Sequence, residues 1–144
     1  MNNGTIYSSK TDMWATPIEL FKMLDMEFHF TLDPCCTHEN AKCHKHYTKE
    51  ENGLLQDWSG ETVFCNPPYG RELKKWVKKC AEESVKPGTT IVMLVPSRTD
   101  TEWFQKYVYH HAELRFIKGR IKFGEGKNHA PFASMIVIFN TNIQ

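Results

Sequence analysis

The run Thr89–Pro96 (TTIVMLVP) is the feature that most restricts how this chain can fold. It is apolar almost throughout, whereas a strand with one face in water alternates apolar and polar side chains. Continuous apolarity is typical of a strand covered on both faces, and such strands belong to parallel sheets with helices packed on either side. The run therefore predicts a central strand of an α/β fold.

The segments around this run alternate between helical and extended patterns. The clearest helix repeats Leu73, Trp76 and Val77 at three- and four-residue spacing. An earlier helix is expected to start with Thr16 as its N-cap and Pro17 at its first position. The alternation predicts a three-layer, Rossmann-like α/β fold, with a mostly parallel sheet that ends in an antiparallel hairpin. The expected strands are 28–32, 61–65, 89–96, 114–123 and 132–139, and the later expected helices are 71–84 and 100–111.

Length and composition fit one compact domain. The 144 residues, 40% of them hydrophobic, suffice for one core, and we expect a flexible arm over 1–13 and a single domain over 14–144. No apolar stretch approaches the roughly 20 residues of a membrane helix, and the polar start lacks a signal peptide's apolar segment. With five cysteines in no regular framework, these features predict a cytoplasmic protein without membrane contact. The net charge is +1, so any affinity for nucleic acid must come from local basic patches.

The tetrad Asn66-Pro67-Pro68-Tyr69 follows an expected core strand and carries the most informative chemistry. Two prolines stiffen the corner, so the Asn66 side-chain oxygen and a proline carbonyl can accept both protons of a planar amine. The amine's lone pair would then face an incoming methyl group, and Tyr69 would offer a ring for a base to stack on. Because Asn66 is neutral, the rate would come from alignment and fixed dipoles rather than from a general base. The alternative interpretation is a structural Pro-Pro turn with Tyr69 packed inside.

Two other expected strand ends are unusual, Asp33-Pro34 and Pro96-Ser97-Arg98. In an open α/β sheet, ligands bind at the carboxyl ends of the strands. If the strands are adjacent and parallel, these corners and the tetrad form one crevice, although Asp33 alone also suits a turn. A cluster of Cys and His residues follows Asp33, but it has one arm and no second pair, so we predict no metal site; its members are Cys35, Cys36, His38, Cys43, His44 and His46.

The chain resembles the small phage-type DNA N-6-adenine methyltransferases of the Dam-like group over about residues 14–140. The stretches that carry the resemblance are TPIELFKML, FTLDPCCTHENAKC, YTKEENGLLQDW, FCNPPYGRELKKWVKK, MLVPSRTDTEWF and RFIKGRIKFGEGKNHAPFASMIVIF. The resemblance implies S-adenosylmethionine as methyl donor and adenine in double-stranded DNA as acceptor. The adenine would be flipped out of the helix into the tetrad.

The resemblance also implies a role for each matching residue. The catalytic set is Asn66, Pro67, Pro68 and Tyr69. The donor would contact Trp14, Thr16, Pro17, Asp33, Pro34, Asp57, Trp58 and Asn66, with Asp57 and Trp58 at its adenine. Arg98 and Arg120 would lie near the target base or the DNA backbone. Local clusters of positive charge, rather than the resemblance, add Arg71, Lys74 and Lys122 as candidate DNA contacts. The alternative interpretation is that Asp57 is a turn residue and Trp58 a core aromatic. The basic residues could likewise form ion pairs or a solvated helix face.

Two departures from larger methyltransferases matter. They carry a glycine-rich turn after the first strand, whereas here no glycine follows Asp33-Pro34 until Gly53. The chain also lacks room for a separate target-recognition domain, so specificity would come from the arm 1–14, the loop 124–131 or a partner in a homodimer. Other acceptors stay open, namely an RNA adenine, a cytosine amine or a protein glutamine, as does a non-catalytic nucleic-acid-binding module.

Overall fold

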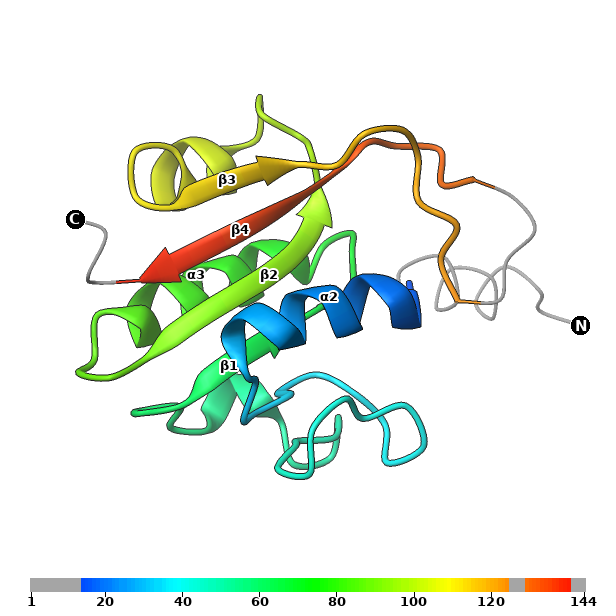
Figure 1. Cartoon of the computed structure of the whole chain (residues 1–144). Helices are drawn as coiled ribbons and strands as arrows, with labels where there is room; N and C mark the ends of the chain where they lie inside the picture. Colours follow the sequence, from blue (N-terminus) through cyan, green and yellow to red (C-terminus); the bar gives the residue numbers. More distant parts are fainter. Residues whose placement is uncertain (1–13, 125–128, 141–144) are drawn as a thin grey trace, which may run out of the picture.

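The computed structural model describes residues 14–124 and 129–140, so the expected arm 1–13 and part of the loop 124–131 lie outside the described residues. A four-stranded sheet forms the middle of the molecule (Figure 1). Its strands are β1 (Thr62–Cys65), β2 (Thr90–Pro96), β3 (Glu113–Phe116) and β4 (Ser134–Asn140), in the order β1-β2-β4-β3.

The α/β class and the closing hairpin are confirmed, but the sheet is mixed rather than mostly parallel. β1 pairs with β2 in parallel, and β4 then lies antiparallel to both β2 and β3. β2 is central, as its apolar run predicted, because Ile91 through Pro96 are all buried. β1, β2 and β3 therefore point the same way, and the segments that follow them leave from one edge of the sheet, the carboxyl edge (Figure 1).

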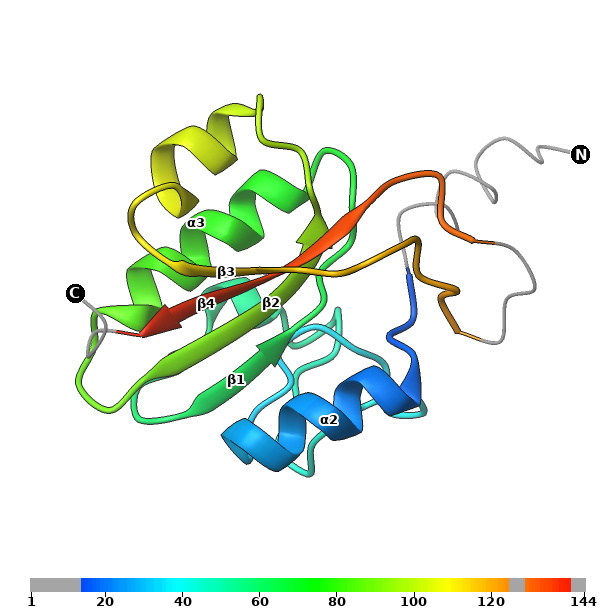
Figure 2. The same ribbon diagram turned by 45° about the horizontal axis from the view of Figure 1, so that its top comes forward.

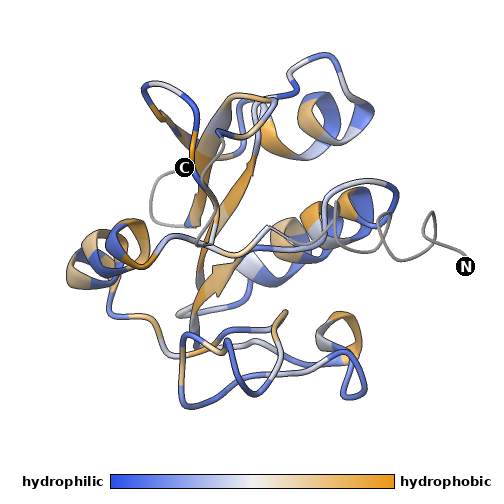
Figure 3. Cartoon of the chain, turned by 90° about the vertical axis from the view of Figure 1, so that its right-hand side faces the viewer, coloured by the Kyte–Doolittle hydropathy of each residue, from blue (hydrophilic) through white to orange (hydrophobic). Residues whose placement is uncertain are grey.

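Helices cover both faces of the sheet and make three layers. α2 (Ile18–Phe28) lies on one face, where Phe21 packs edge-on against Phe64 of β1. α3 (Leu73–Ser84) and the π-helical segment η2 (Phe104–Val108) lie on the other (Figure 2). The view along the sheet shows hydrophobic strands between helices that mix hydrophobic and hydrophilic residues (Figure 3). None of the helices in the described ranges has the length and apolarity to cross a membrane.

The expected strand 28–32 is wrong. α2 runs to Phe28, and His29 ends it in the left-handed conformation with φ 58°. The Asp25 carboxylate then accepts the Phe30 N–H at 2.8 Å, which turns the chain back toward the sheet. An extended stretch does lie beside β1, but it pairs with β1 only through one isolated parallel bridge, between Leu32 and Val63.

The start of α2 also differs from expectation. Pro17 occupies the N-cap position with ψ 137°, and no side chain caps the helix. Thr16 points its hydroxyl elsewhere, as described below. The expected helix 100–111 is reduced to a short helical stretch dominated by η2, and the expected strand 114–123 to β3.

Candidate active site

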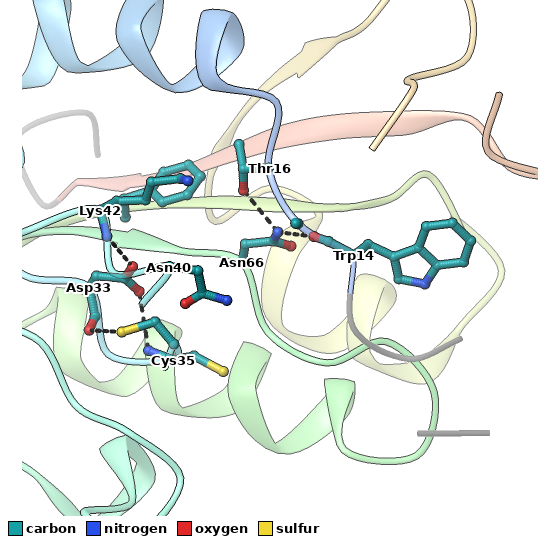
Figure 4. A pocket seen from close by; sticks show the side chains of 10 residues that line it. Trp14, Thr16, Asp33, Cys35, Asn40, Lys42 and Asn66 are labelled. Atoms are coloured by element: carbon teal, nitrogen blue, oxygen red, sulfur yellow. Dashed lines mark hydrogen bonds between the residues drawn. The ribbon is translucent and has the colours of Figure 1, made fainter. Parts of the chain in front are cut away.

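Asn66 stands directly after β1, at the carboxyl edge, and both ends of its side-chain amide are engaged. Its Nδ2 donates to the backbone carbonyl of Trp14 and, at 2.9 Å, to Thr16 Oγ1. Its Oδ1 accepts from the Tyr69 hydroxyl at 3.0 Å. Figure 4 shows Asn66 between the segment that carries Trp14 and Thr16 and the corner that carries Asp33. The tetrad is thus tied to residues some fifty positions earlier in the chain.

Tyr69 is a core residue in this structure. Only 2% of its surface is exposed, and its hydroxyl lies 2.9 Å from the Leu94 carbonyl as well as near Asn66. The ring meets Phe132 edge-on at 5.6 Å between centroids and Phe123 at 6.3 Å. Burial raises the pKa of Tyr69 well above its ordinary value, so the phenol stays protonated. The expectation that Tyr69 offers a free ring for stacking does not hold in this conformation.

Asp33 forms the second corner and is 4% exposed. Its carboxylate accepts the backbone N–H of Cys35 at 3.3 Å and that of Lys42 at 3.0 Å, which closes the polar loop 35–42 onto it. Burial raises the pKa of the Asp33 carboxyl, and these two N–H groups oppose the rise. Asp33 and Asn66 line the same cavity.

A cavity of about 250 Å³ opens between the two corners (Figure 4). It brings together four residues that the sequence assigned to the donor, Trp14, Thr16, Asp33 and Asn66. Pro17 and Pro34 are the chain neighbours of lining residues. The lining residues that the sequence assignment missed are Ala15, Cys35, Cys36, Asn40, Lys42 and Phe64. The sequence signal for these lining residues is that the stretch 35–42 follows the Asp33-Pro34 corner directly. The Cys and His residues of this stretch were considered only as metal ligands.

Comparison with known proteins gives the chain its family. The family model described as DNA N-6-adenine-methyltransferase (Dam) matches residues 3–144. The chain belongs to this family. A DNA N-6-adenine-methyltransferase of Haemophilus phage HP1 is 33% identical over 147 residues, covering 96% of this chain and 84% of the relative. One of Escherichia phage T1 is 34% identical over 109 residues, covering 74% of this chain but 45% of that longer relative.

Not every residue assigned from the Dam resemblance reaches the cavity. The Trp58 indole is fully buried, stacked near Trp76 at 6.4 Å, and its Nε1 donates to the Gly53 carbonyl at 3.0 Å. It is a core aromatic here and has no face for a ligand. Asp57 is exposed and pairs with Lys86 at 3.0 Å. Neither residue lines the cavity, so the structure favours the turn-and-core interpretation of this pair.

The five basic residues that the sequence assigned to DNA are all exposed. Three of them lie in segments that follow strands at the carboxyl edge of the sheet. Arg98 follows β2 and lies over the Phe132 ring at 5.7 Å. Arg120 and Lys122 follow β3, and Arg71 and Lys74 lie at the start of α3, just after the tetrad. The ion pairs found among the described residues do not involve these five.

The cysteines of the loop are free. Burial raises the pKa of the Cys35 thiol to about 12, so it lines the cavity as a neutral group. His38 and His46 lie 2.9 Å apart between ring nitrogens. Over the described ranges, no group of three or more His, Cys, Asp or Glu residues is placed to hold a metal ion.

Proposed function

We propose that this chain transfers a methyl group from S-adenosylmethionine to the N-6 amine of an adenine in double-stranded DNA. Family membership supports the reaction class. The observation that carries the proposal is that Asn66 belongs both to the tetrad corner and to the lining of the cavity. A donor held in the cavity and a base held at the corner would therefore meet at this side chain.

The cavity suits the methionine end of the donor. A carboxylate, a hydroxyl and an ammonium line it, from Asp33, Thr16 and Lys42. They offer partners of both signs to a ligand end that carries an ammonium, a carboxylate and a sulfonium. Its volume of about 250 Å³ is small for a whole nucleoside-based ligand, since ligand pockets usually span about 300–1,000 Å³. When bound, S-adenosylmethionine would supply an electrophilic methyl group on its sulfonium.

At the corner, the Asn66 oxygen and a proline carbonyl would accept hydrogen bonds from the two N–H groups of the adenine amine. This aligns the nitrogen lone pair with the methyl group, and alignment together with fixed dipoles supplies the rate. No side chain needs to remove a proton first, because the amine can lose it after the methyl group has arrived. Tyr69 stays protonated and would act as a hydrogen-bond donor at Asn66 rather than as a base.

The aromatic residues around Tyr69 define what the incoming base must displace. Phe132, which is half-buried, lies on Tyr69 beneath Arg98. A flipped adenine that stacked on Tyr69 would have to take the place of Phe132. Flipping itself costs a few kcal/mol, and contacts of Arg98, Arg120 and Lys122 with phosphates would help to offset that cost.

The test is methyl transfer from labelled S-adenosylmethionine to unmethylated duplex DNA, followed by nucleoside mass spectrometry. We expect N-6-methyladenine from the wild type, and a rate at least about 100-fold lower from Asn66→Ala because its positioned acceptor is lost. Calorimetry should show that this variant still binds the donor. Full activity of Asn66→Ala would remove the tetrad from the mechanism. Label in RNA or protein but not in DNA would change the acceptor, and failure of the wild type to bind the donor would leave a binding module.

A further inference from the structure

The side-chain amide of Asn66 has two orientations that differ by exchange of oxygen and nitrogen. Only the one that presents the oxygen can accept a hydrogen bond from an amine N–H, since the nitrogen end is purely a donor. An exposed asparagine would sample both orientations. An enzyme that depends on the oxygen therefore gains from neighbours that select it.

Three neighbours hold the amide in one orientation, and the Trp14 carbonyl selects it, because the hydroxyls of Thr16 and Tyr69 can each donate or accept. The Trp14 carbonyl can only accept, so the amide nitrogen must face it. Thr16 Oγ1 lies 2.9 Å from the same nitrogen and takes the second N–H. At the other end, the Tyr69 hydroxyl meets the amide oxygen at 3.0 Å, although it can turn its single hydrogen to the Leu94 carbonyl instead.

The segment 14–16 that supplies two of these contacts is itself fixed. The Ala15 carbonyl accepts from the Gly124 N–H at 2.7 Å. The Trp14 ring packs edge-on against Phe123 at 5.3 Å and Phe132 at 5.2 Å. Trp14 and Thr16 thus form a rigid acceptor pair just before α2.

Thr16 also borders the donor cavity and is only 7% exposed. Toward Asn66 its oxygen acts as an acceptor, which leaves its own O–H free to donate. Among the hydrogen bonds between described residues, none is donated by that O–H. One hydroxyl therefore faces the nitrogen end of Asn66 with a lone pair and can turn its hydrogen toward the cavity.

We propose that Thr16 is a positioning residue that locks the Asn66 amide with its oxygen available to the target amine. The inference rests on the proposed function, because the orientation of Asn66 matters only if its oxygen accepts a hydrogen bond from the amine that is methylated. The sequence predicted Thr16 as the N-cap of α2, but its side chain does not cap that helix. The contact with Asn66 explains where its hydroxyl is used instead. Its hydroxyl acts through Asn66 and does not itself touch the acceptor base.

The kinetic test uses two substitutions that separate oxygen from shape. Thr16→Val keeps the branched shape and loses the acceptor, whereas Thr16→Ser keeps the acceptor and loses the methyl group. We expect Thr16→Val to lower kcat, at saturating S-adenosylmethionine and DNA, by about 10- to 100-fold through misalignment. Thr16→Ser should recover most of that loss. The opposite ranking would show a packing role, and a change confined to KM for the donor would show a donor contact only. Either result would overturn the proposal.

A second readout needs neither donor nor DNA. In ¹⁵N-labelled protein, the Asn66 side-chain NH₂ signals can be assigned by their loss in Asn66→Asp. We expect them to be shifted downfield and slow to exchange with water in the wild type and in Thr16→Ser. In Thr16→Val, the signal of the N–H that faces Thr16 should lose both properties, because the Trp14 carbonyl still accepts only the other N–H. Unchanged signals in Thr16→Val would refute the lock even if the enzyme were active. If the wild type methylated no DNA, the proposed function would fail while these spectra still decided the orientation.

Discussion

At the scale of single residues, the role of Tyr69 changes most between sequence and structure. As the last member of the tetrad it was expected to present a ring to the target base, but it lies in the core with its hydroxyl between Asn66 and Leu94. Its hydroxyl can donate to only one of the two acceptors at a time. The residue therefore links the catalytic corner to β2 and contributes both packing and a polar contact.

Tyr69→Phe keeps the ring and removes only the polar contact. We expect it to lower the free energy of unfolding by about 1–3 kcal/mol, because it leaves a buried acceptor without its donor. Urea unfolding measures this, and Tyr109→Phe is the control, since Tyr109 is 48% exposed and surface changes of this kind stay within about 0.5 kcal/mol. Equal stability of the two variants would show that the Tyr69 hydroxyl contributes nothing to the fold.

The sequence identified Asn66 correctly as a corner residue because proline geometry is local. It could not show that Tyr69 is covered, because the covering rings, Phe123 and Phe132, come from more than fifty residues later in the chain. The same holds for Trp58, whose burial depends on Trp76 and on the Gly53 carbonyl. Side-chain types are visible in a sequence, but their exposure is set by partners that the fold brings in.

At the scale of elements, the 3-10 turn η1 (Gly53–Leu55) supports the Asp33-Pro34 corner. The sequence showed no glycine near Pro34, yet Gly53 packs directly against it. A Cβ at position 53 would lie 2.1 Å from the Pro34 carbonyl oxygen. A glycine nineteen residues later in the chain thus meets the need for close approach at this corner.

Gly53→Ala should force Pro34 and the turn apart. We expect a loss of about 1–3 kcal/mol in the free energy of unfolding from overpacking, and weaker donor binding because Pro34 adjoins the cavity residues Asp33 and Cys35. Gly60→Ala is the control. Gly60 has φ 77° and nothing within 4 Å of the place where a Cβ would lie, so alanine there strains only the backbone. Thermal melts and calorimetry with S-adenosylmethionine measure both effects. Donor affinity that fell equally in the two variants would contradict a specific role for Gly53.

The elements that were predicted well are those with strong patterns of their own. β2 and α3 appear close to their expected bounds because continuous apolarity and helical spacing each indicate one structure. Apolar and polar side chains alternate over 28–32 as in a strand. However, Phe28 belongs to α2, so too few residues remain to pair fully with β1. Such competition between neighbouring elements for the same residues is not visible in either pattern alone.

At the scale of the whole molecule, strand direction decides where the charge gathers. Because β1, β2 and β3 point the same way, the tetrad, Arg98 and the segment with Arg120 and Lys122 all emerge at the carboxyl edge. The net charge of +1 hides this distribution. The sequence predicted that the ends of adjacent parallel strands, Asp33-Pro34, the tetrad and Pro96-Ser97-Arg98, would lie together. The antiparallel β4 places the segment after β3 at the same edge.

The basic residues at this edge should govern how DNA binding depends on salt. The logarithm of the DNA association constant falls with the logarithm of salt concentration by about 0.9 for each phosphate neutralised. Replacing Arg120 and Lys122 with alanine should therefore make the slope shallower by about 1–2 and weaken binding to all sequences alike.

Lys106→Ala is the control. Lys106 lies by Phe139, which pairs with Ile91 at the opposite end of β2. Fluorescence anisotropy of a labelled duplex over a range of KCl concentrations gives both slopes. If Lys106→Ala changed the slope as much as the double variant did, the DNA surface would not be confined to the carboxyl edge.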